Sequence, residues 1–154
     1  MNNIYFIVAQ SGSGKTSICN LLKEKYNITF DEYNNCATAE QVENNDLYII
    51  DPKGVDFFMK SYKGSKTPKV IFISSDMTTR YERMKSRAEE NGSEYMDAVK
   101  SSLERITNDV VEFYDYIHNN AHVDFKITNN DDCDINSVVD KIYEYIRSCE
   151  GGDA

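Results

Sequence analysis

The feature that most constrains this chain is an apolar run over residues 4–9 that leads directly into a glycine-rich loop and then a helical pattern. A continuous apolar run of this length is typical of a strand buried on both faces of a parallel sheet. Gly12 and Gly14 can take backbone angles closed to other residues, and they leave no side chain between the main chain and an anion. A strand, a glycine-rich turn and a helix in this order predict a phosphate-binding loop at the edge of a sheet.

The loop matches the P-loop pattern G-x-x-x-x-G-K-[S/T], except that Ala9 stands in place of the first glycine. Ala9 ends the expected strand, where backbone angles are ordinary, so we expect its methyl group to be tolerated. Lys15 would supply a positive charge for the β- and γ-phosphates of a nucleotide, and Thr16 would supply a hydroxyl for Mg²⁺. The alternative is a glycine- and serine-rich turn without a ligand, but the flanking strand and helix favour phosphate binding. The predicted phosphate-binding residues are Ser11, Gly12, Ser13, Gly14, Lys15, Thr16 and Ser17.

Length and charge limit the classes of protein to which the chain can belong. Its 154 residues predict a single domain over residues 1–154. A formal net charge of −9 opposes binding to nucleic acid. No apolar stretch approaches the ~20 residues that span a bilayer. The first residues lack the basic region of a signal peptide, so we expect no membrane contact and a cytoplasmic location.

Strand-length apolar runs alternate with helical patterns along the chain, which predicts an α/β fold: a three-layer α/β/α sandwich around a parallel sheet. Residues 31–45 are polar and are expected to form a loop or short helix. A long helix after Ser93 is expected to bury a stripe of Met96, Val99, Leu103, Ile106, Val110, Phe113 and Ile117. The other expected helices cover residues 16–26, 53–62, 76–90 and 135–147, and the expected strands cover residues 4–9, 28–30, 47–50, 70–74 and 123–128.

Polar residues follow several of the expected strands. Asp51 follows the strand over residues 47–50, and Asn129 follows the last strand. Ligands of parallel α/β sheets bind at the carboxyl ends of the strands. We therefore expect these residues and the turn over residues 74–76 to share one rim with the glycine-rich loop.

Asp51 is the candidate acidic residue of this rim. A carboxylate there can hold Mg²⁺ through water or orient the attacking group. Aspartate before proline is also a common turn starter, which is the alternative interpretation. Because a P-loop requires a metal partner, Thr16 and Asp51 are the predicted Mg²⁺ ligands.

Three arginines, Arg80, Arg83 and Arg87, are spaced by three and four residues on one expected helix, so their side chains share a face. Such a face could belong to a lid that brings cations to the transferring phosphoryl group and excludes water. It could also belong to a solvated helix whose neighbouring glutamates form salt bridges with the arginines.

Five pieces of the chain occur in an order that resembles guanylate kinase, a nucleoside monophosphate kinase: residues 11–17, 51–54, 82–87, 114–116 and 127–131. The resemblance is strongest over residues 1–26 and 46–149. It implies a P-loop NTPase fold with a five-stranded parallel sheet in the order 2-3-1-4-5, and a mobile lid over residues 76–100.

The resemblance also implies roles for individual residues. Lys15 and the loop amides would bind the phosphates of ATP. Asp51 would lie between donor and acceptor, and Arg83 and Arg87 match the two lid arginines at the same four-residue spacing. Asn129 would lie near the adenine ring. The implied catalytic set is therefore Lys15, Asp51, Arg83 and Arg87, acting with ATP and Mg²⁺.

Two departures from the family concern cations. A further lid arginine is matched only by Lys100, with Arg105 more than a turn beyond it, and lysine loses the bidentate fork of arginine. The subdomain that grips the acceptor phosphate is reduced to residues 29–46, which contain neither arginine nor lysine.

The reduced acceptor segment is acidic, and carboxylates repel a phosphate at close range. Tyr33, Asn34 and Asn35 could hydrogen-bond a base or sugar but cannot replace an arginine clamp. Asp31, Glu32 or Asp51 could orient the acceptor. The carboxylates of the segment are Asp31, Glu32, Glu40, Glu43 and Asp46.

The sequence therefore predicts an ATP-dependent phosphotransferase that moves the γ-phosphate to a nucleoside monophosphate or a similar small acceptor. A kinase for a neutral or cationic small molecule is one alternative. A non-catalytic nucleotide-binding or protein-interaction module on a guanylate-kinase-like scaffold is another. The chain is expected to be a monomer or homodimer.

Overall fold

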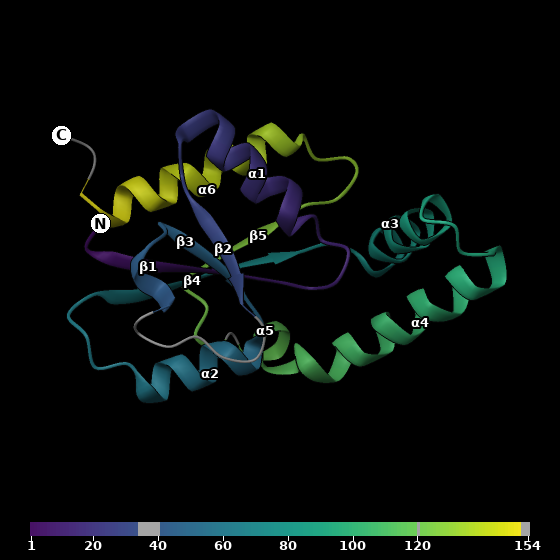
Figure 1. Ribbon diagram of the computed structural model, residues 1–154, viewed down its shortest axis with the longest axis horizontal. Helices are drawn as coiled ribbons and strands as arrows, with labels where there is room; N and C mark the ends of the chain where they lie inside the picture. The colour runs from purple at the N-terminus through teal and green to yellow at the C-terminus, as the bar shows by residue number, and fades with distance from the viewer. Residues whose placement is uncertain (34–40, 120, 152–154) are drawn as a thin grey trace.

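The structure of the protein is a computed structural model that describes residues 1–33, 41–119 and 121–151. Its middle layer is a five-stranded sheet, and helices lie on both faces (Figure 1). The elements in chain order are β1 (Asn3–Ala9), α1 (Lys15–Tyr26), β2 (Phe30–Tyr33), the 3₁₀ turn η1 (Gln41–Glu43), β3 (Leu47–Ile50), α2 (Pro52–Ser61), β4 (Thr67–Ser74), α3 (Met77–Glu90), α4 (Tyr95–Glu112), α5 (Tyr114–His118), β5 (Phe125–Thr128) and α6 (Ile135–Cys149).

The strands are parallel and lie in the order β2-β3-β1-β4-β5, which confirms the predicted topology. β1 is the central strand and pairs with β4 over its full length, from Asn3 opposite Thr67 to Ala9 opposite Ile73. Because all strands run the same way, their carboxyl ends form a single rim. The glycine-rich loop leaves β1 at this rim.

Alternate residues of β1 enter two separate cores. Tyr5 and Ile7 face the layer of α1 and α6, whereas Phe6 and Val8 pack with α2 and α5 (Figure 1). All four of these side chains are fully buried. Burying a large apolar side chain contributes roughly 1.5–3 kcal/mol, so β1 stabilises both layers at once. Double burial explains why its sequence is a continuous apolar run.

The second strand differs from the expectation. The sequence pattern favoured residues 28–30, but the strand covers Phe30–Tyr33. Ile28 belongs instead to the turn that ends α1, where its N–H donates to the Leu22 carbonyl at 3.3 Å. β2 is an edge strand paired only with β3. An edge strand tolerates exposed carboxylates because main-chain pairing, not apolar burial, holds it in place.

The long helix also differs from the expectation. It is broken at Phe113 into α4 and α5, and most of the predicted apolar stripe is exposed. Ile106 and Phe113 are buried, but Met96 is 70% exposed and Leu103 and Val110 are each 51% exposed. The reason is the position of α4. It packs beside α3 in a helical arm (residues 77–112) that projects beyond the rim of the sheet, so its apolar face does not reach the core (Figure 1).

The predicted lid over residues 76–100 covers α3 and the start of α4, and therefore lies in this arm. Its movement stays a prediction, as does the assignment of residues 1–154 to a single domain. Among the described residues, no helix combines the length and the apolar character needed to cross a membrane.

Glu150, just after α6, links the C-terminal end of that helix to the start of β1 through hydrogen bonds. Its carboxylate accepts hydrogen bonds from the Tyr5 hydroxyl at 2.6 Å, from the Asn2 N–H at 2.6 Å and from the Asn3 amide. Burial alone would raise the pKa of Glu150, but these hydrogen bonds outweigh it and lower the pKa below its ordinary value. The ionised carboxylate is therefore the stabilising form.

We expect Glu150→Gln to lower the free energy of unfolding by about 1 kcal/mol at pH 7, because the partly solvated charged acceptor is lost. Since the folded-state pKa is depressed, this contribution is present above the unfolded pKa and disappears as pH falls through the folded pKa. Urea unfolding at pH 7 and at successively lower pH measures the difference. Glu144→Gln, an exposed change on α6, is the matched control. A deficit that persists undiminished in acid would contradict the charge-based explanation.

Candidate active site at the glycine-rich loop

The glycine-rich loop joins β1 to α1 and depends on two glycines with left-handed backbone angles. Gly12 has φ +79° and Gly14 has φ +86°, a region that side chains disfavour. A Cβ on Gly12 would lie 2.9 Å from the carbonyl oxygen of Arg80, and one on Gly14 would lie 2.7 Å from the side-chain nitrogen of Asn129. The loop is therefore held between α3 and the segment after β5, and anion binding at the N-terminus of α1 stays a prediction.

Asn129 braces this loop from the end of β5. Its side-chain amide donates to the Ser13 carbonyl at 2.9 Å, and its backbone N–H donates to the Ser74 carbonyl at 2.8 Å. The residue is only 4% exposed. The structure thus places Asn129 at the rim, as expected, and gives it a structural role. Contact of Asn129 with a nucleotide stays a prediction.

A buried ion pair joins the two helices of the arm, and its carboxylate also contacts the loop. Nη1 of Arg80 on α3 lies 3.0 Å from Oδ2 of Asp109 on α4, and both side chains are almost fully buried. The same carboxylate accepts hydrogen bonds from the Ser11 N–H at 2.9 Å and the Ser11 hydroxyl at 3.2 Å. Burial lowers the pKa of the Arg80 guanidinium, and the charge of Asp109 opposes that shift. Arg80 is therefore a structural cation of the arm and is not a lid arginine.

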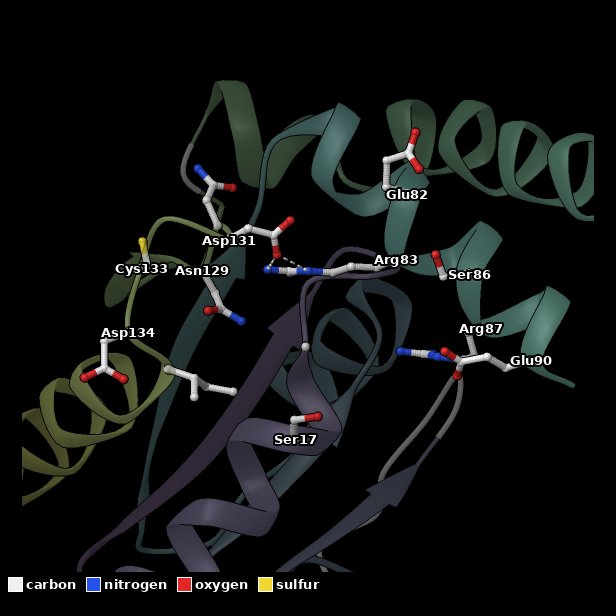
Figure 2. A pocket seen from close by; sticks show the side chains of 13 residues that line it. Ser17, Glu82, Arg83, Ser86, Arg87, Glu90, Asn129, Asp131, Cys133 and Asp134 are labelled. Carbon is white, nitrogen blue, oxygen red and sulfur yellow. Dashed lines mark hydrogen bonds and ion pairs between the residues drawn. The ribbon is translucent and has the colours of Figure 1, made fainter.

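The other arginines of the arm lie at the loop. Arg83 donates to the Gly12 carbonyl at 3.0 Å. It also pairs with Asp131 at 3.0 Å, and Figure 2 shows this pair. Arg105 on α4 donates to the Ser11 hydroxyl at 3.0 Å. The guanidinium of Arg87 makes no hydrogen bond or ion pair within the described part of the chain, although its backbone carbonyl accepts from the Asn91 N–H. Three cationic side chains therefore surround the loop in addition to Lys15.

A cavity of about 750 Å³ opens above the start of α1, between the arm and the segment that follows β5. Gly14 and Ser17 line it from the loop and the start of α1. Arg83 and Arg87 line it from α3, and Figure 2 shows them with Ser17. Asn129 and residues 130–135 form the facing wall. Its position beside the loop suits the nucleoside part of a bound nucleotide.

A smaller cavity of about 160 Å³ lies beside Lys15, at the carboxyl ends of the central strands. Lys15 Nζ lies 4.0 Å from Oε1 of Glu32 on β2. Asp51 lines the same cavity, and its carboxylate also accepts a hydrogen bond from the Gly54 N–H at 2.8 Å as the cap of α2. The two interpretations of Asp51, as a turn or helix-capping residue and as a site residue, are therefore compatible. The same side chain caps α2 and lines the cavity.

Glu112, at the end of α4, also lines this small cavity, and no pattern in the sequence points to it. Burial raises the pKa of Glu112, and the charges of Asp109 and Asp51 raise it further, against the opposing charges of Lys15 and Lys53. A carboxylate with a raised pKa accepts a proton more readily than an ordinary glutamate does. Glu112 lies at the site because of the way α4 crosses the rim of the sheet. The spacing of apolar residues in the sequence does not reveal that crossing.

The donor groups fit the Mg²⁺ ion that the loop pattern implies. Thr16 is exposed in the first turn of α1, and Asp51 faces the cavity beside Lys15. Within the described ranges, no three His, Cys, Asp or Glu side chains are close enough together to form a metal cage. Mg²⁺ at phosphoryl-transfer sites is held by one or two protein groups together with phosphates and water. Thr16 and Asp51 are oxygen donors of the kind that Mg²⁺ prefers, and their role as ligands stays a prediction.

The described acidic residues of the acceptor segment do not all lie at the small cavity. Glu32 lines the cavity beside Lys15, whereas Asp31 does not line it. Asp46 lies at the opposite, amino-terminal end of the strands, where it accepts hydrogen bonds from the Thr29 N–H and hydroxyl. Asn34, Asn35 and Glu40 lie outside the described residues.

Comparison with known proteins shows the fold. No family model matches the chain, and no curated protein matches its sequence. An uncharacterized protein from Eubacterium ventriosum is similar in structure with a TM-score of 0.60 and 16% identity, over 96% of this chain and 99% of that chain. Shikimate kinase from Bacteroides thetaiotaomicron is similar with a TM-score of 0.56 and 12% identity, over 94% of this chain and 98% of that chain. The chain thus shares its layered α/β fold with these two proteins, and the resemblance to guanylate kinase stays a prediction.

We expect Asp109→Asn to lower the free energy of unfolding by about 3 kcal/mol, because it leaves the buried Arg80 charge uncompensated. Asp97→Asn, an exposed change in the first turn of α4, should cost at most about 0.5 kcal/mol. Urea unfolding measures both variants.

The double variant Arg80→Met, Asp109→Leu should recover much of the loss, because an apolar pair removes the unpaired charge. If Asp109→Asn costs no more than Asp97→Asn, the ion pair is not what holds the arm.

Proposed function

We propose that the protein is an ATP-dependent phosphotransferase that acts on a small acceptor. The observation that carries the proposal is the convergence of cations on the glycine-rich loop: Lys15 from α1, Arg83 and Arg87 from α3, and Arg105 from α4. Phosphoryl transfer requires positioning and positive charge around the transferring group more than covalent chemistry. One of the similar structures is a shikimate kinase, whose reaction class agrees with this proposal.

In the proposed reaction, an acceptor hydroxyl attacks the γ-phosphorus of ATP in line. The new oxygen–phosphorus bond forms while the bond to the β,γ-bridging oxygen breaks, and its electron pair leaves with ADP. Asp51 or Glu112 takes the hydroxyl proton. Lys15 and the arginines of the arm stabilise the charge on the equatorial oxygens. Mg²⁺, held by Thr16 and Asp51, would neutralise charge on the β- and γ-phosphates.

A nucleoside monophosphate acceptor, which the resemblance to guanylate kinase implies, stays a prediction. Residues 29–46 contain neither lysine nor arginine to grip its phosphate. Among the described residues around the small cavity, the three carboxylates of Glu32, Asp51 and Glu112 outnumber the two cations, Lys15 and Arg105. These charges favour a neutral or cationic acceptor over an anionic one.

A second candidate function, a nucleotide-binding interaction module, is favoured by the exposed apolar face of α4. Met96, Leu103 and Val110 lie seven residues apart on one side of the helix, and each is more than half exposed. Exposed apolar faces of this kind mark interaction surfaces. In that function the loop would bind a nucleotide without transferring its phosphate.

We expect ATP with Mg²⁺ to raise the melting temperature by about 5–10 °C at a hundredfold excess over Kd. Lys15→Ala should remove most of this shift, because the charge that faces the phosphates is lost. Lys23→Ala, an exposed change on the same helix, is the matched control and should leave the shift intact. Thermal unfolding followed by circular dichroism measures all three proteins.

ATP consumption should then be screened with nucleoside monophosphates, nucleosides and small alcohols. Turnover that depends on Lys15 supports the phosphotransferase, and turnover with GMP would favour the resemblance to guanylate kinase. Stabilisation without turnover on any acceptor would favour the interaction module. If no nucleoside triphosphate stabilises the protein, both functions are wrong.

A further inference from the structure

A third cavity, of about 620 Å³, lies between the start of α2 and the junction of α4 with α5. It shares Asp51 and Glu112 with the small cavity beside Lys15, so the two spaces adjoin at these carboxylates. A molecule bound in the larger cavity could therefore present one of its groups to the phosphates at the glycine-rich loop. The larger cavity is well placed for a phosphate acceptor.

The charges that line this cavity are mainly negative. Among the described residues, four carboxylates and a single cation, Lys53, line it. The carboxylates are Asp51, Asp56, Glu112 and Asp115. Asp56 Oδ1 lies 3.0 Å from Nε2 of His122, and Asp115 Oδ1 accepts a hydrogen bond from the Asn119 amide at 3.0 Å. The surplus of negative charge repels anions and attracts cations.

Tyr116 supplies an independent indication that the cavity accepts a polar molecule. It lines the cavity and is only 2% exposed, with its ring packed against Phe72 and Phe113. Its buried hydroxyl has no hydrogen-bond partner among the described residues. Burial raises the pKa of Tyr116, and the charges of Asp56 and Asp51, which line the same cavity, raise it further. A buried hydroxyl without a partner costs free energy that a ligand's polar group can recover.

The arrangement suits an organic cation better than a metal ion. In the part of the chain that the structure describes, no three acidic, histidine or cysteine side chains are close enough together to hold a metal. The carboxylates are instead spread around a cavity of about 620 Å³, with apolar wall provided by Pro52, Val111 and Ala121. Ammonium groups on a carbon framework can pair with separated carboxylates while the framework packs on apolar wall.

We propose that this cavity binds the phosphate acceptor, and that the acceptor is a small alcohol that carries ammonium groups. The inference rests on the proposed phosphotransferase function. The ammonium groups pair with Asp56 and Asp115, and the Tyr116 hydroxyl hydrogen-bonds a polar group of the acceptor. The reacting hydroxyl lies at the junction of the two cavities. Its oxygen bonds to the γ-phosphorus of ATP, ADP leaves with the electron pair of the broken bond, and Asp51 or Glu112 takes the proton.

Three six-membered-ring probes of similar size test the charge preference: 2-deoxystreptamine is cationic, myo-inositol is neutral and shikimate is anionic. Isothermal titration of the full chain without nucleotide should show 2-deoxystreptamine binding at least tenfold more tightly than myo-inositol, and no binding of shikimate. Binding of the cation should weaken as salt is added, because exposed charges are screened. Equal binding of the three probes, or a preference for shikimate, would overturn the proposal.

Tyr116→Phe separates a ligand-binding role from a structural one. Removing the unpartnered hydroxyl should raise the melting temperature of the free protein and weaken 2-deoxystreptamine binding about tenfold. Asp56→Asn should also weaken binding about tenfold, whereas Asp97→Asn, an exposed change at the far end of α4, should leave it unchanged. If Tyr116→Phe and Asp56→Asn both bind the probe as the wild type does, the cavity is not the binding site.

Thermal shifts with ATP and Mg²⁺ on the same samples distinguish the two proposals. Stabilisation by ATP with no binding of 2-deoxystreptamine would overturn the acceptor assignment and leave the proposed function standing. Binding of 2-deoxystreptamine without any effect of ATP would support the cavity as a cation site and overturn the phosphotransferase. ATP consumption stimulated by 2-deoxystreptamine, and lost in Lys15→Ala, would support both.

Discussion

The buried carboxylate of Asp109 joins the two helices of the arm through Arg80 and holds the arm against the glycine-rich loop through Ser11, and the geometry of the site follows from it. The Asp109 carboxylate also accepts hydrogen bonds from the Ser11 N–H and hydroxyl, so arm and loop meet at one group. Arg80 is the one buried residue among those described on α3, so the arm has little apolar core of its own to fix its position. A buried pair of this kind adds little net stability, yet removing one partner is costly. The pair therefore determines where the arm lies.

The position of the arm in turn sets the charges around the site. Arg83, Arg87 and Arg105 reach the loop only because α3 and α4 leave the rim beside it. Glu112 reaches the opposite side because α4 ends there, next to Asp51. The result is a gradient of charge: cations lie around the loop where phosphates would bind, and among the described residues carboxylates outnumber cations in the two cavities beside it. A phosphotransferase with a cationic acceptor is consistent with that gradient.

Much of the fold was predictable because it follows from local patterns. The doubly buried strand β1 is a continuous apolar run, and the alternation of strands and helices predicted the layered α/β architecture. The strand order came from the resemblance to a known family and was confirmed. Two predictions were wrong for the same reason. β2 and the exposed stripe of α4 both lie at the periphery, where packing partners, not hydrophobicity, decide which residues pair or become buried.

The glycine-rich loop could be read from the amino-acid sequence without a structure, because the need for positive φ at Gly12 and Gly14 is a property of single residues. Lys15 and Asp51 could be assigned to one rim in the same way, since the carboxyl ends of parallel strands meet at one edge. The packing of the helices was needed to show that Arg80 is a structural cation and that Glu112 lines the cavity beside Lys15. Arg80 and Asp109 are 29 residues apart, and their pairing depends on how two helices cross, which no local pattern encodes.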